Sequence, residues 1–384
     1  MKIAFTSDYF YPHTGGAEQS LMELARSLVK KGHDVTVYTR GEGRESEING
    51  IKVKRIFHTL DRWTFKNEVL FPKYVDRKEA KRFLTQIRKE GYDVIHSNNR
   101  DTAVFTAMAG KKAGVPSVTH IRDYWPICPK RDLHRLEGIC KEPNKCWSCM
   151  SKYYGDWLKT PFYWKSQRDT KYRHDSVKRY SELFIYNSRY VRDKVGLKPG
   201  TVIYNPVDIE VTQKQRIPGK VLFIGNVTKR KGIIELSRAM KYDDMGEMEL
   251  HIVGDGYLSP AIKGSNIIKH GRLEYEDVKK HLADAEMLIV PSLWPEPFGR
   301  VAVEGMAAGV PVISSSYGGL KEAVGEAGIL LNEVTEKGLK QAILKLHEDP
   351  ELRDELSEKG MERSKMFSPE RIADQVLSIY KKVI

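Results

Sequence analysis

The sequence predicts an α/β protein with two Rossmann-like domains, and three observations support this prediction. Short apolar runs alternate with longer amphipathic segments, which is typical of parallel strands joined by crossover helices. Glycine-containing turns follow several of the apolar runs, as expected where a strand turns into a helix. The chain of 384 residues is too long for one ordinary core and suits two domains of nearly equal size.

Composition narrows the class of protein. The 40% hydrophobic and 30% charged residues are typical of a globular chain. No apolar stretch approaches about 18 residues, so no transmembrane helix is expected, and the start MKIAFTSDYF reads as a strand rather than a signal peptide. We therefore expect a cytoplasmic protein. The net charge of +13 and the pI near 9.3 predict an acidic partner: a nucleoside diphosphate, an anionic lipid or a nucleic acid.

The first half begins with a βαβ pattern. Strands are expected at residues 2–6 and 35–38, with a helix at 17–31 between them. Gly15 and Gly16 lie directly before the N-terminus of this helix. This pair is not the G-x-G-x-x-G fingerprint of nicotinamide binding. A helix start made flexible by glycine is the structural alternative to a ligand site. Further strands are expected at 51–57, 93–96, 115–120 and 183–187.

The second half follows a polar linker at 212–220. A glycine-bounded turn at 225–232 comes after its first apolar run and opens a helix, which places Arg230 and Lys231 where an anion would lie. A solvated basic turn is the alternative. Strands are expected at 221–224, 249–253, 267–270, 287–290 and 310–314.

The stretch at 285–319 carries the clearest chemical signal. An apolar strand runs into a proline-rich break that holds Glu296, and a helix of small residues follows that holds Glu304. A carboxylate can accept hydrogen bonds from sugar hydroxyls, and a helix start favours a phosphate. The backbone N–H groups at that helix start belong to Phe298, Gly299 and Arg300. An ordinary βαβ unit with two surface glutamates is the alternative.

These motifs resemble those of the retaining glycosyltransferases of family four. The resemblance is carried by Glu-x7-Glu within PEPFGRVAVEGMAAGVPV, followed by YGG at 317–319 and by Glu322. Other pieces of the family pattern occur in the expected order along nearly the whole chain. They are Gly15-Gly16-Ala17-Glu18, Asn205-Pro206-Val207-Asp208, the turn 225–232 and Val253-Gly254-Asp255-Gly256.

The resemblance implies the GT-B fold, in which two Rossmann-like domains face each other across a cleft. On this basis we expect an acceptor-side domain at 1–200, with an insertion at about 124–180, and a nucleotide-sugar-binding domain at 215–365. The C-terminal helix at 368–384, capped by Ser368 with Pro369 at its first position, is expected to return to the first domain.

The implied activity is transfer of a sugar from a nucleoside diphosphate sugar, a UDP or GDP sugar, to a glycan or lipid-linked acceptor with retention of anomeric configuration. Arg230 and Lys231 would stabilise the leaving phosphate, Glu296 would position the sugar, and Glu304 would hold the ribose. Gly15, Gly16 and the helix start at 298–300 complete the implied donor site. Many relatives have Arg where this chain has Asn226. No Asp-x-Asp motif is present, so no catalytic metal is expected.

His120 is a further candidate, at the carboxyl end of an expected strand. Family members often carry a His there that faces the sugar or acceptor. The segment THIRDYW also allows Arg122-Asp123 to align with the family's His-Asp pair. A lone His is more often structural than catalytic, so both alignments stay open.

Other functions fit the same architecture. A sugar-nucleotide epimerase would turn over donor without an acceptor, and a phosphorylase would cleave glycan with phosphate. A non-catalytic glycan-binding or nucleic-acid-binding protein would turn over no donor, and the nucleic-acid binder would show a steep salt dependence.

All four cysteines fall between 128 and 149, in the spacing Cys-x11-Cys-x5-Cys-x2-Cys. This spacing predicts a structural zinc site, because four thiolates bind tetrahedral zinc and the segment is too polar to form its own core. Two disulfides, an iron–sulfur cluster and free thiols are the alternatives. The proposed ligands are Cys128, Cys140, Cys146 and Cys149.

The stretch at 153–180 is rich in Tyr, Trp, Lys and Arg. Such residues suit the headgroup region of an anionic membrane, so we expect peripheral association with the inner face of the cell membrane. A packed aromatic core under a solvated basic face is the alternative. Nucleic acid is not an expected partner, because no nucleic-acid-binding motif accompanies the stretch.

Overall fold

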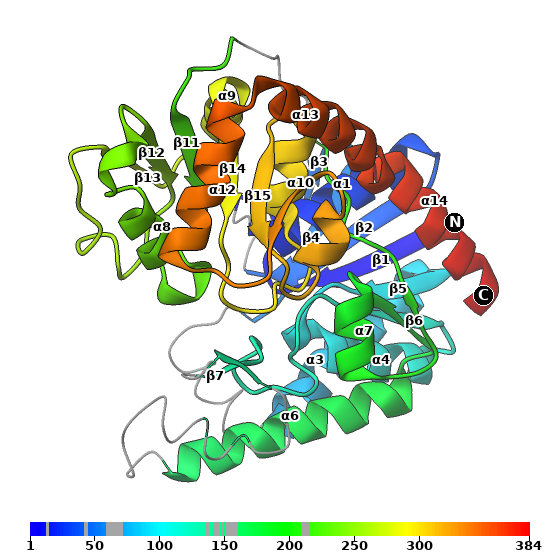
Figure 1. Cartoon of the computed structure of the whole chain (residues 1–384). Coiled ribbons are helices and arrows are strands. Elements are labelled where there is room, and N and C mark those ends of the chain that lie inside the picture. Colours follow the sequence, from blue (N-terminus) through cyan, green and yellow to red (C-terminus); the bar gives the residue numbers. More distant parts are fainter. Residues whose placement is uncertain are drawn as a thin grey trace. The chain divides into compact units, whose positions relative to one another are not determined.

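The computed structural model describes residues 1–12, 15–41, 45–58, 72–135, 138–140, 146, 149, 160–208 and 215–384. It divides the chain into two compact units, each with its own sheet and helices (Figure 1). Unit 1 comprises Met1–Pro206 with Pro369–Ile384, and unit 2 comprises Val207–Ser368. The expected domains at 1–200 and 215–365 differ from these units by three to eight residues at their boundaries. The predicted α/β class is confirmed, because both main sheets are built from parallel strands with helices between them.

The main sheet of unit 1 has the strand order β10-β9-β6-β5-β1-β2-β4-β3. All neighbours are parallel except β3 and β4. The order reverses between the parallel neighbours β1 and β5: the strands β2, β4 and β3 continue on the side of β1, and β6, β9 and β10 continue on the side of β5. Its strands are β1 (Lys2–Ser7), β2 (Asp34–Arg40), β3 (Ser46–Ile48), β4 (Ile51–Phe57), β5 (Val94–Ser97), β6 (Ser117–Ile121), β9 (Leu183–Tyr186) and β10 (Gly200–Val202).

The C-terminal helix α14 (Pro369–Val383) is part of the core of unit 1. Its residues Ile372, Val376 and Tyr380 are buried in the cluster that contains β1 and helix α1. The Tyr380 hydroxyl lies 2.6 Å from Nδ1 of His96 on β5. The other helices of the unit are α1 (Gly16–Lys30), α3 (Pro72–Glu90), α4 (Arg100–Ala113), α6 (Thr160–Tyr180) and α7 (Arg189–Val195).

Helix α6 shortens the predicted insertion. It lies between β6 and β9, which are neighbouring parallel strands, so it has the position of an ordinary crossover helix. The departure from alternation therefore ends before Thr160. The described part before it holds a small antiparallel pair, β7 (His134–Arg135) and β8 (Gly138–Ile139). The aromatic and basic composition of 160–180 hid its helical pattern from the sequence analysis.

Unit 2 has the strand order β13-β12-β11-β14-β15-β16, all parallel. Taken in chain order this is 3-2-1-4-5-6, the doubly wound order of a Rossmann fold. Its strands are β11 (Lys220–Ile224), β12 (Glu249–Val253), β13 (Ile267–Gly271), β14 (Met287–Val290), β15 (Val312–Ser315) and β16 (Gly328–Leu331). Its helices are α8 (Ile233–Ala239), α9 (Tyr275–Asp284), α10 (Arg300–Ala307), α11 (Leu320–Val324), α12 (Glu336–Glu348) and α13 (Pro350–Ser364), with short 3-10 turns η3 (Lys229–Lys231), η4 (Asp243–Met245) and η5 (Lys365–Phe367).

The strand order locates the ligand site of unit 2. In a doubly wound sheet, ligands bind beyond the carboxyl ends of the strands where the order reverses. That point lies between β11 and β14, which pair through Val221 with Met287 and Leu222 with Leu288. The loops that follow these two strands are the turn at 225–232 and the proline-rich segment at 291–299. Both motifs that the sequence singled out therefore lie at the predicted position.

Candidate functional site at the switch point of unit 2

Glycines let the loops at the switch point pack backbone against backbone. Gly232 has φ +70°, and a Cβ there would lie 1.8 Å from the carbonyl oxygen of Pro291. A Cβ at Gly254 would lie 2.0 Å from the oxygen of Gly225, and one at Gly256 would lie 2.4 Å from the oxygen of Val227. These glycines have no room for a side chain. The turn at 225–232 is thus fixed against its neighbours, and it leaves Asn226 exposed.

Glu296 lies at the centre of a charged cluster. Its Oε1 atom accepts from Lys231 Nζ at 2.5 Å, Ser292 Oγ at 2.7 Å and Trp294 Nε1 at 2.8 Å. The guanidinium of Arg230 lies 5.0 Å from the centre of the Trp294 ring. Glu296 is only 7% exposed. Three donors on one oxygen fix the carboxylate, while Oε2 has no hydrogen bond to any described residue and can accept one from a ligand.

A second glycine pair holds the Glu296 loop in place. Gly318 forms an isolated parallel bridge with Glu296, and the N–H of Gly319 donates to the Glu296 carbonyl at 2.6 Å. A Cβ on Gly318 would lie 2.4 Å from that carbonyl oxygen. The YGG motif is therefore a backbone support for the acidic loop.

Glu304 belongs to a separate polar group on α10. It is 4% exposed, and its Oε1 accepts from Arg300 Nε at 2.7 Å and from the Tyr275 hydroxyl at 3.2 Å. Gly299 starts the helix in a left-handed conformation, φ +96°. The Phe298 ring packs edge-on against Phe367 at 5.4 Å, so its side chain supports the fold while its backbone lies beside the helix start.

The structure thus brings Arg230, Lys231 and Glu296 together, and it pairs Arg300 with Glu304. The sequence analysis missed three contributors: Ser292, Trp294 and Tyr275. Trp294 carried a usable signal, because it stands two residues before Glu296 in the motif WPEP. Tyr275 carried none, because it reaches Glu304 from the start of a different helix.

In unit 1, Gly15 and Gly16 are exposed at the start of α1. The Gly15 N–H donates to Glu18 Oε2 at 3.1 Å, and Asn99 Nδ2 donates to Glu18 Oε1 at 2.9 Å. Asn99 follows β5, so the glycine pair lies near the point where the order of this sheet reverses. Residues 13 and 14, which precede the pair, lie outside the described residues.

His120 is buried on β6 with 2% exposure. Its ring stacks on His96 at 5.4 Å, and neither ring nitrogen has a hydrogen-bond partner among the described residues. Burial and the Arg122 guanidinium hold the pKa of His120 well below its usual value of 6.5, so the ring is neutral at pH 7. Arg122 donates to Asn98 at 2.8 Å and to Asn205 at 2.5 Å.

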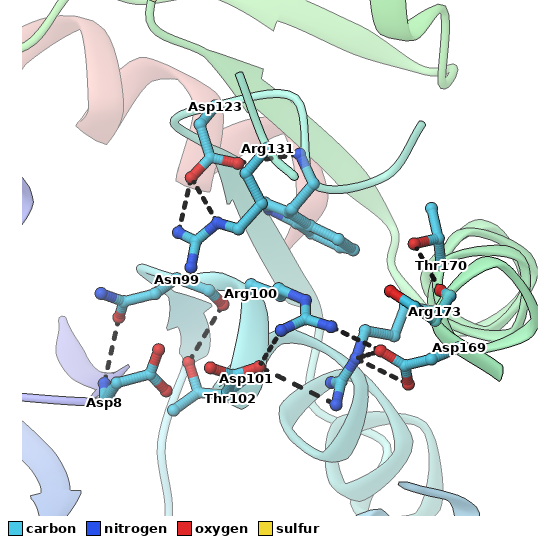
Figure 2. Close-up of polar contacts among 12 residues, drawn as sticks. Asp8, Asn99, Arg100, Asp101, Thr102, Asp123, Arg131, Asp169, Thr170 and Arg173 are labelled. Carbon is cyan, nitrogen blue, oxygen red and sulfur yellow. Dashed lines mark hydrogen bonds and ion pairs between the residues drawn. The ribbon is translucent and has the colours of Figure 1, made fainter. Parts of the chain in front are cut away.

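Ion pairs surround the carboxyl edge of this sheet. Figure 2 shows Asp123 bound by Arg131, at 3.0 Å from Nε and 2.6 Å from Nη2. It also shows Asp169 of α6 bound by Arg100 of α4 at 2.5 Å and by Arg173 at 3.1 Å. The Asp123 carboxylate is therefore committed to the segment after β6, and the pair of Arg100 and Asp169 fastens α6 to α4.

The four cysteines form no disulfide. Cys128 and Cys140 are buried, and Cys146 and Cys149 are half-buried. Burial raises the pKa of the Cys128 thiol. No three of their sulfur atoms lie within 4.8 Å of one another in the described part of the chain. The zinc site stays a prediction.

Two family models match the chain. The model described as Glycosyltransferase Family 4 matches residues 14–211, and that described as Glycosyl transferases group 1 matches residues 207–363. An uncharacterized glycosyltransferase of Methanocaldococcus jannaschii is 35% identical over 100% of this chain and 99% of its own length.

Solved structures share the fold at low identity. A sucrose-phosphate synthase from Thermosynechococcus elongatus has a TM-score of 0.72 and 19% identity, over 99% of this chain and 98% of its own. The Anabaena protein HepE, in a complex with UDP-glucose, has a TM-score of 0.71 and 20% identity over 100% of both chains.

Fold and relatives together define the class: the protein is a glycosyltransferase with the GT-B fold. More narrowly, the chain belongs to glycosyltransferase family 4.

Proposed function

We propose that this glycosyltransferase moves a sugar from a nucleoside diphosphate sugar to a glycan or lipid-linked acceptor, with retention of anomeric configuration. The observation that carries the proposal is the cluster of Arg230, Lys231 and Glu296 at the switch point of unit 2. Two cations and a fixed carboxylate with one open oxygen suit a diphosphate next to a sugar.

Charge supports the donor assignment. The leaving diphosphate gains negative charge as the glycosidic bond breaks, and preorganised cations lower that barrier most. Lys231 is already held by Glu296 at 2.5 Å, so its ammonium group is in place before the reaction. Glu304, fixed by Arg300, is assigned to the ribose hydroxyls. The solved HepE complex contains UDP-glucose, which supports a UDP sugar as the first donor to test.

The geometry of Glu296 supports a positioning role. Its Oε1 already accepts three hydrogen bonds, which lowers its nucleophilicity. We therefore assign retention to attack on the same face that the diphosphate leaves, with the diphosphate accepting the acceptor's proton. His120 is neutral and has no partner for its ring nitrogens among the described residues, so it is assigned to the acceptor or sugar side.

Helix α6 supports peripheral association with an anionic membrane. From Trp164 to Lys178 its exposed side chains, among those described, recur every three or four residues and so share one face, which Arg179 borders: Trp164, Arg168, Lys171, Asp175, Lys178 and Arg179. Trp164 is 57% exposed, and Arg168 lies 4.8 Å from the centre of its ring. One aromatic and four basic groups against one acid suit anionic headgroups. Among the described helices, none is long and apolar enough to cross a membrane.

We also propose that Cys128, Cys140, Cys146 and Cys149 bind one structural zinc ion. Their clustering in sequence and the small size of the described β7–β8 pair support this, because a short polar segment gains little from burial. Elemental analysis of protein purified without added metal tests it. Less than about a third of an equivalent of zinc, with no titratable thiols, would establish disulfides instead.

A panel of sugar nucleotides tests the main proposal. One donor should raise Tm above the others, and that donor should be consumed only when an acceptor glycan is present. NMR of the product should then show the donor's anomeric configuration. Isomerised donor without acceptor would establish an epimerase, phosphate-dependent glycan cleavage a phosphorylase, and no turnover with any donor a binding protein.

A further inference from the structure

Three histidines lie close together near the β13 edge of the unit 2 sheet, away from the reversal point between β11 and β14. His251 lies on β12, His270 on the edge strand β13, and His281 on α9. Each offers a ring nitrogen, and these nitrogens lie within 4.8 Å of one another. Nδ1 of His251 is 3.1 Å from Nε2 of His270, and the ring centres of His270 and His281 are 4.2 Å apart. It is the only such group of His, Cys, Asp or Glu side chains in the described part of the chain.

The sheet register brings the first two rings together. His251 pairs with Ile268, two positions before His270, and the His251 and His270 rings stack with their centres 5.2 Å apart. The register shifts directly beyond this point: Ile252 pairs with Lys269, but Val253 pairs with Gly271. His270 is the extra residue of this bulge, and bulges re-aim side chains. Helix α9 supplies the third ring from its last turn.

The chemistry of the three rings suits a metal better than a hydrogen-bond network. Nδ1 of His281 is buried without a hydrogen-bond partner among the described residues, and the His251–His270 contact satisfies one donor at most. Around tetrahedral zinc, ligand nitrogens bound at about 2.0–2.1 Å stand roughly 3.3 Å apart. The observed spacing of 3.1 Å for one pair, and of 4.8 Å or less for all, needs only small ring rotations to meet that geometry.

The surrounding charges allow a cation. Glu249 lies 3.4 Å from Nε2 of His251, the ring nitrogen that does not face His270, so its carboxylate can hold that N–H and orient Nδ1 toward the metal. Lys220 is the opposing charge, but it is paired with Asp284. Burial lowers the pKa of all three rings, to about 4 for His281.

We propose that His251, His270 and His281 bind one divalent transition-metal ion, with Zn²⁺ or Ni²⁺ as the best fit to an imidazole-rich site. The ion would fasten edge strand β13 and helix α9 to β12. None of these residues belongs to the proposed transfer site, and the metal site stands whether or not the donor assignment holds.

The test measures metal binding by the full-length protein, stripped with chelator and titrated with Zn²⁺ or Ni²⁺. The wild type should bind one equivalent more than His270→Gln, and Tm should rise by about 5–10 °C at a hundredfold excess over Kd. Loss of one ring should weaken this site by about a hundredfold or more. His33→Gln is the matched control, because His33 is also a partly buried ring with a lowered pKa, and it should bind like the wild type.

X-ray absorption on the nickel-loaded wild type needs no variant and separates this site from the cysteines. Nitrogen ligands bind zinc-sized ions at about 2.0–2.1 Å and sulfur at about 2.3 Å. Imidazole scattering that is present in the wild type and His33→Gln supports the proposal. Metal bound only through sulfur, no bound metal, or equal binding by His270→Gln, His251→Gln and the wild type would overturn it.

Discussion

The pair of Lys231 and Glu296 allows structure and catalysis to be separated by a double-mutant cycle. The proposed variants are Lys231→Met, Glu296→Gln and the two combined. In the protein the charged atoms are 2.5 Å apart, and the side chains are 23% and 9% exposed. Lys231→Met leaves a nearly buried carboxylate with only the neutral donors Ser292 and Trp294.

The expected loss of stability follows from that burial. Breaking a fully buried pair costs about 3–5 kcal/mol, whereas an exposed pair contributes about 0–1 kcal/mol. This pair is intermediate and Glu296 keeps two donors, so we expect about 2 kcal/mol, or a fall in Tm of about 4–8 °C for a domain of this size. Adding Glu296→Gln removes the uncompensated charge and should restore part of that loss.

Activity should behave differently from stability. Each single variant should lower kcat by about 10²–10³, the usual effect of losing one preorganised electrostatic contact. The double variant should stay as inactive as the singles although its Tm recovers. The cycle is measured by urea unfolding and by donor turnover. Lys229→Met, at an exposed lysine in the same turn, should match the wild type in both.

Two outcomes would refute this reasoning. If the double variant recovers activity together with stability, Lys231 supports only the fold. If either single variant turns over at the wild-type rate with an unchanged Tm, the charged cluster is not the transfer site.

Three further predictions concern other parts of the chain. Gly232→Ala should destabilise unit 2 strongly, because its Cβ would lie 1.8 Å from the Pro291 oxygen at φ +70°; a Tm within about 1 °C of the wild type would contradict this. Lys178→Glu should weaken binding to anionic vesicles about tenfold in a flotation assay, whereas the control Lys337→Glu, on the exposed surface of unit 2, should not. Equal recovery of the wild type with neutral and anionic vesicles would exclude the electrostatic attraction. Burial and the Arg122 charge lower the pKa of His96 to about 3, so its neutral ring stabilises the fold above pH 6.5 and this stabilisation is lost as pH falls toward 3. Between pH 6.5 and 4.5, the free energy of unfolding measured in urea should therefore fall by on the order of 2 kcal/mol less in His96→Asn than in the wild type. Equal falls in the two proteins would refute the assignment.

The α/β fold could be predicted from the sequence, because short apolar runs alternate with longer amphipathic segments. The turn at 225–232 and the loop of Glu296 each come directly after an apolar run, and the doubly wound order brings such loops together. Tyr275 could not be predicted, because it reaches Glu304 from a different helix and its role depends on side-chain direction, whereas Trp294 could have been found from its place two residues before Glu296. The helical pattern of α6 was obscured by its charge, because charged residues occupy its buried face as well as its exposed one: Asp169 and Arg173 are both buried.

The histidine group could not be predicted, for a different reason. Its members are 19 and 11 positions apart, which matches no metal-binding spacing. Their meeting depends on a bulge between two strands and on the last turn of a helix. Neither feature leaves a mark in composition or periodicity.

Helix α14 has a consequence for synthesis of the chain. Its Ile372, Val376 and Tyr380 fill the core around β1, yet the ribosome adds them only after the whole of unit 2. Until then the first 206 residues lack the helix that covers the apolar surface around β1, whereas unit 2 already has every segment of its own core. Unit 2 can therefore fold first during translation, and the half made earlier must wait for a helix made about 160 residues later. Nascent chains stalled before residue 369 should need a chaperone to protect that apolar surface.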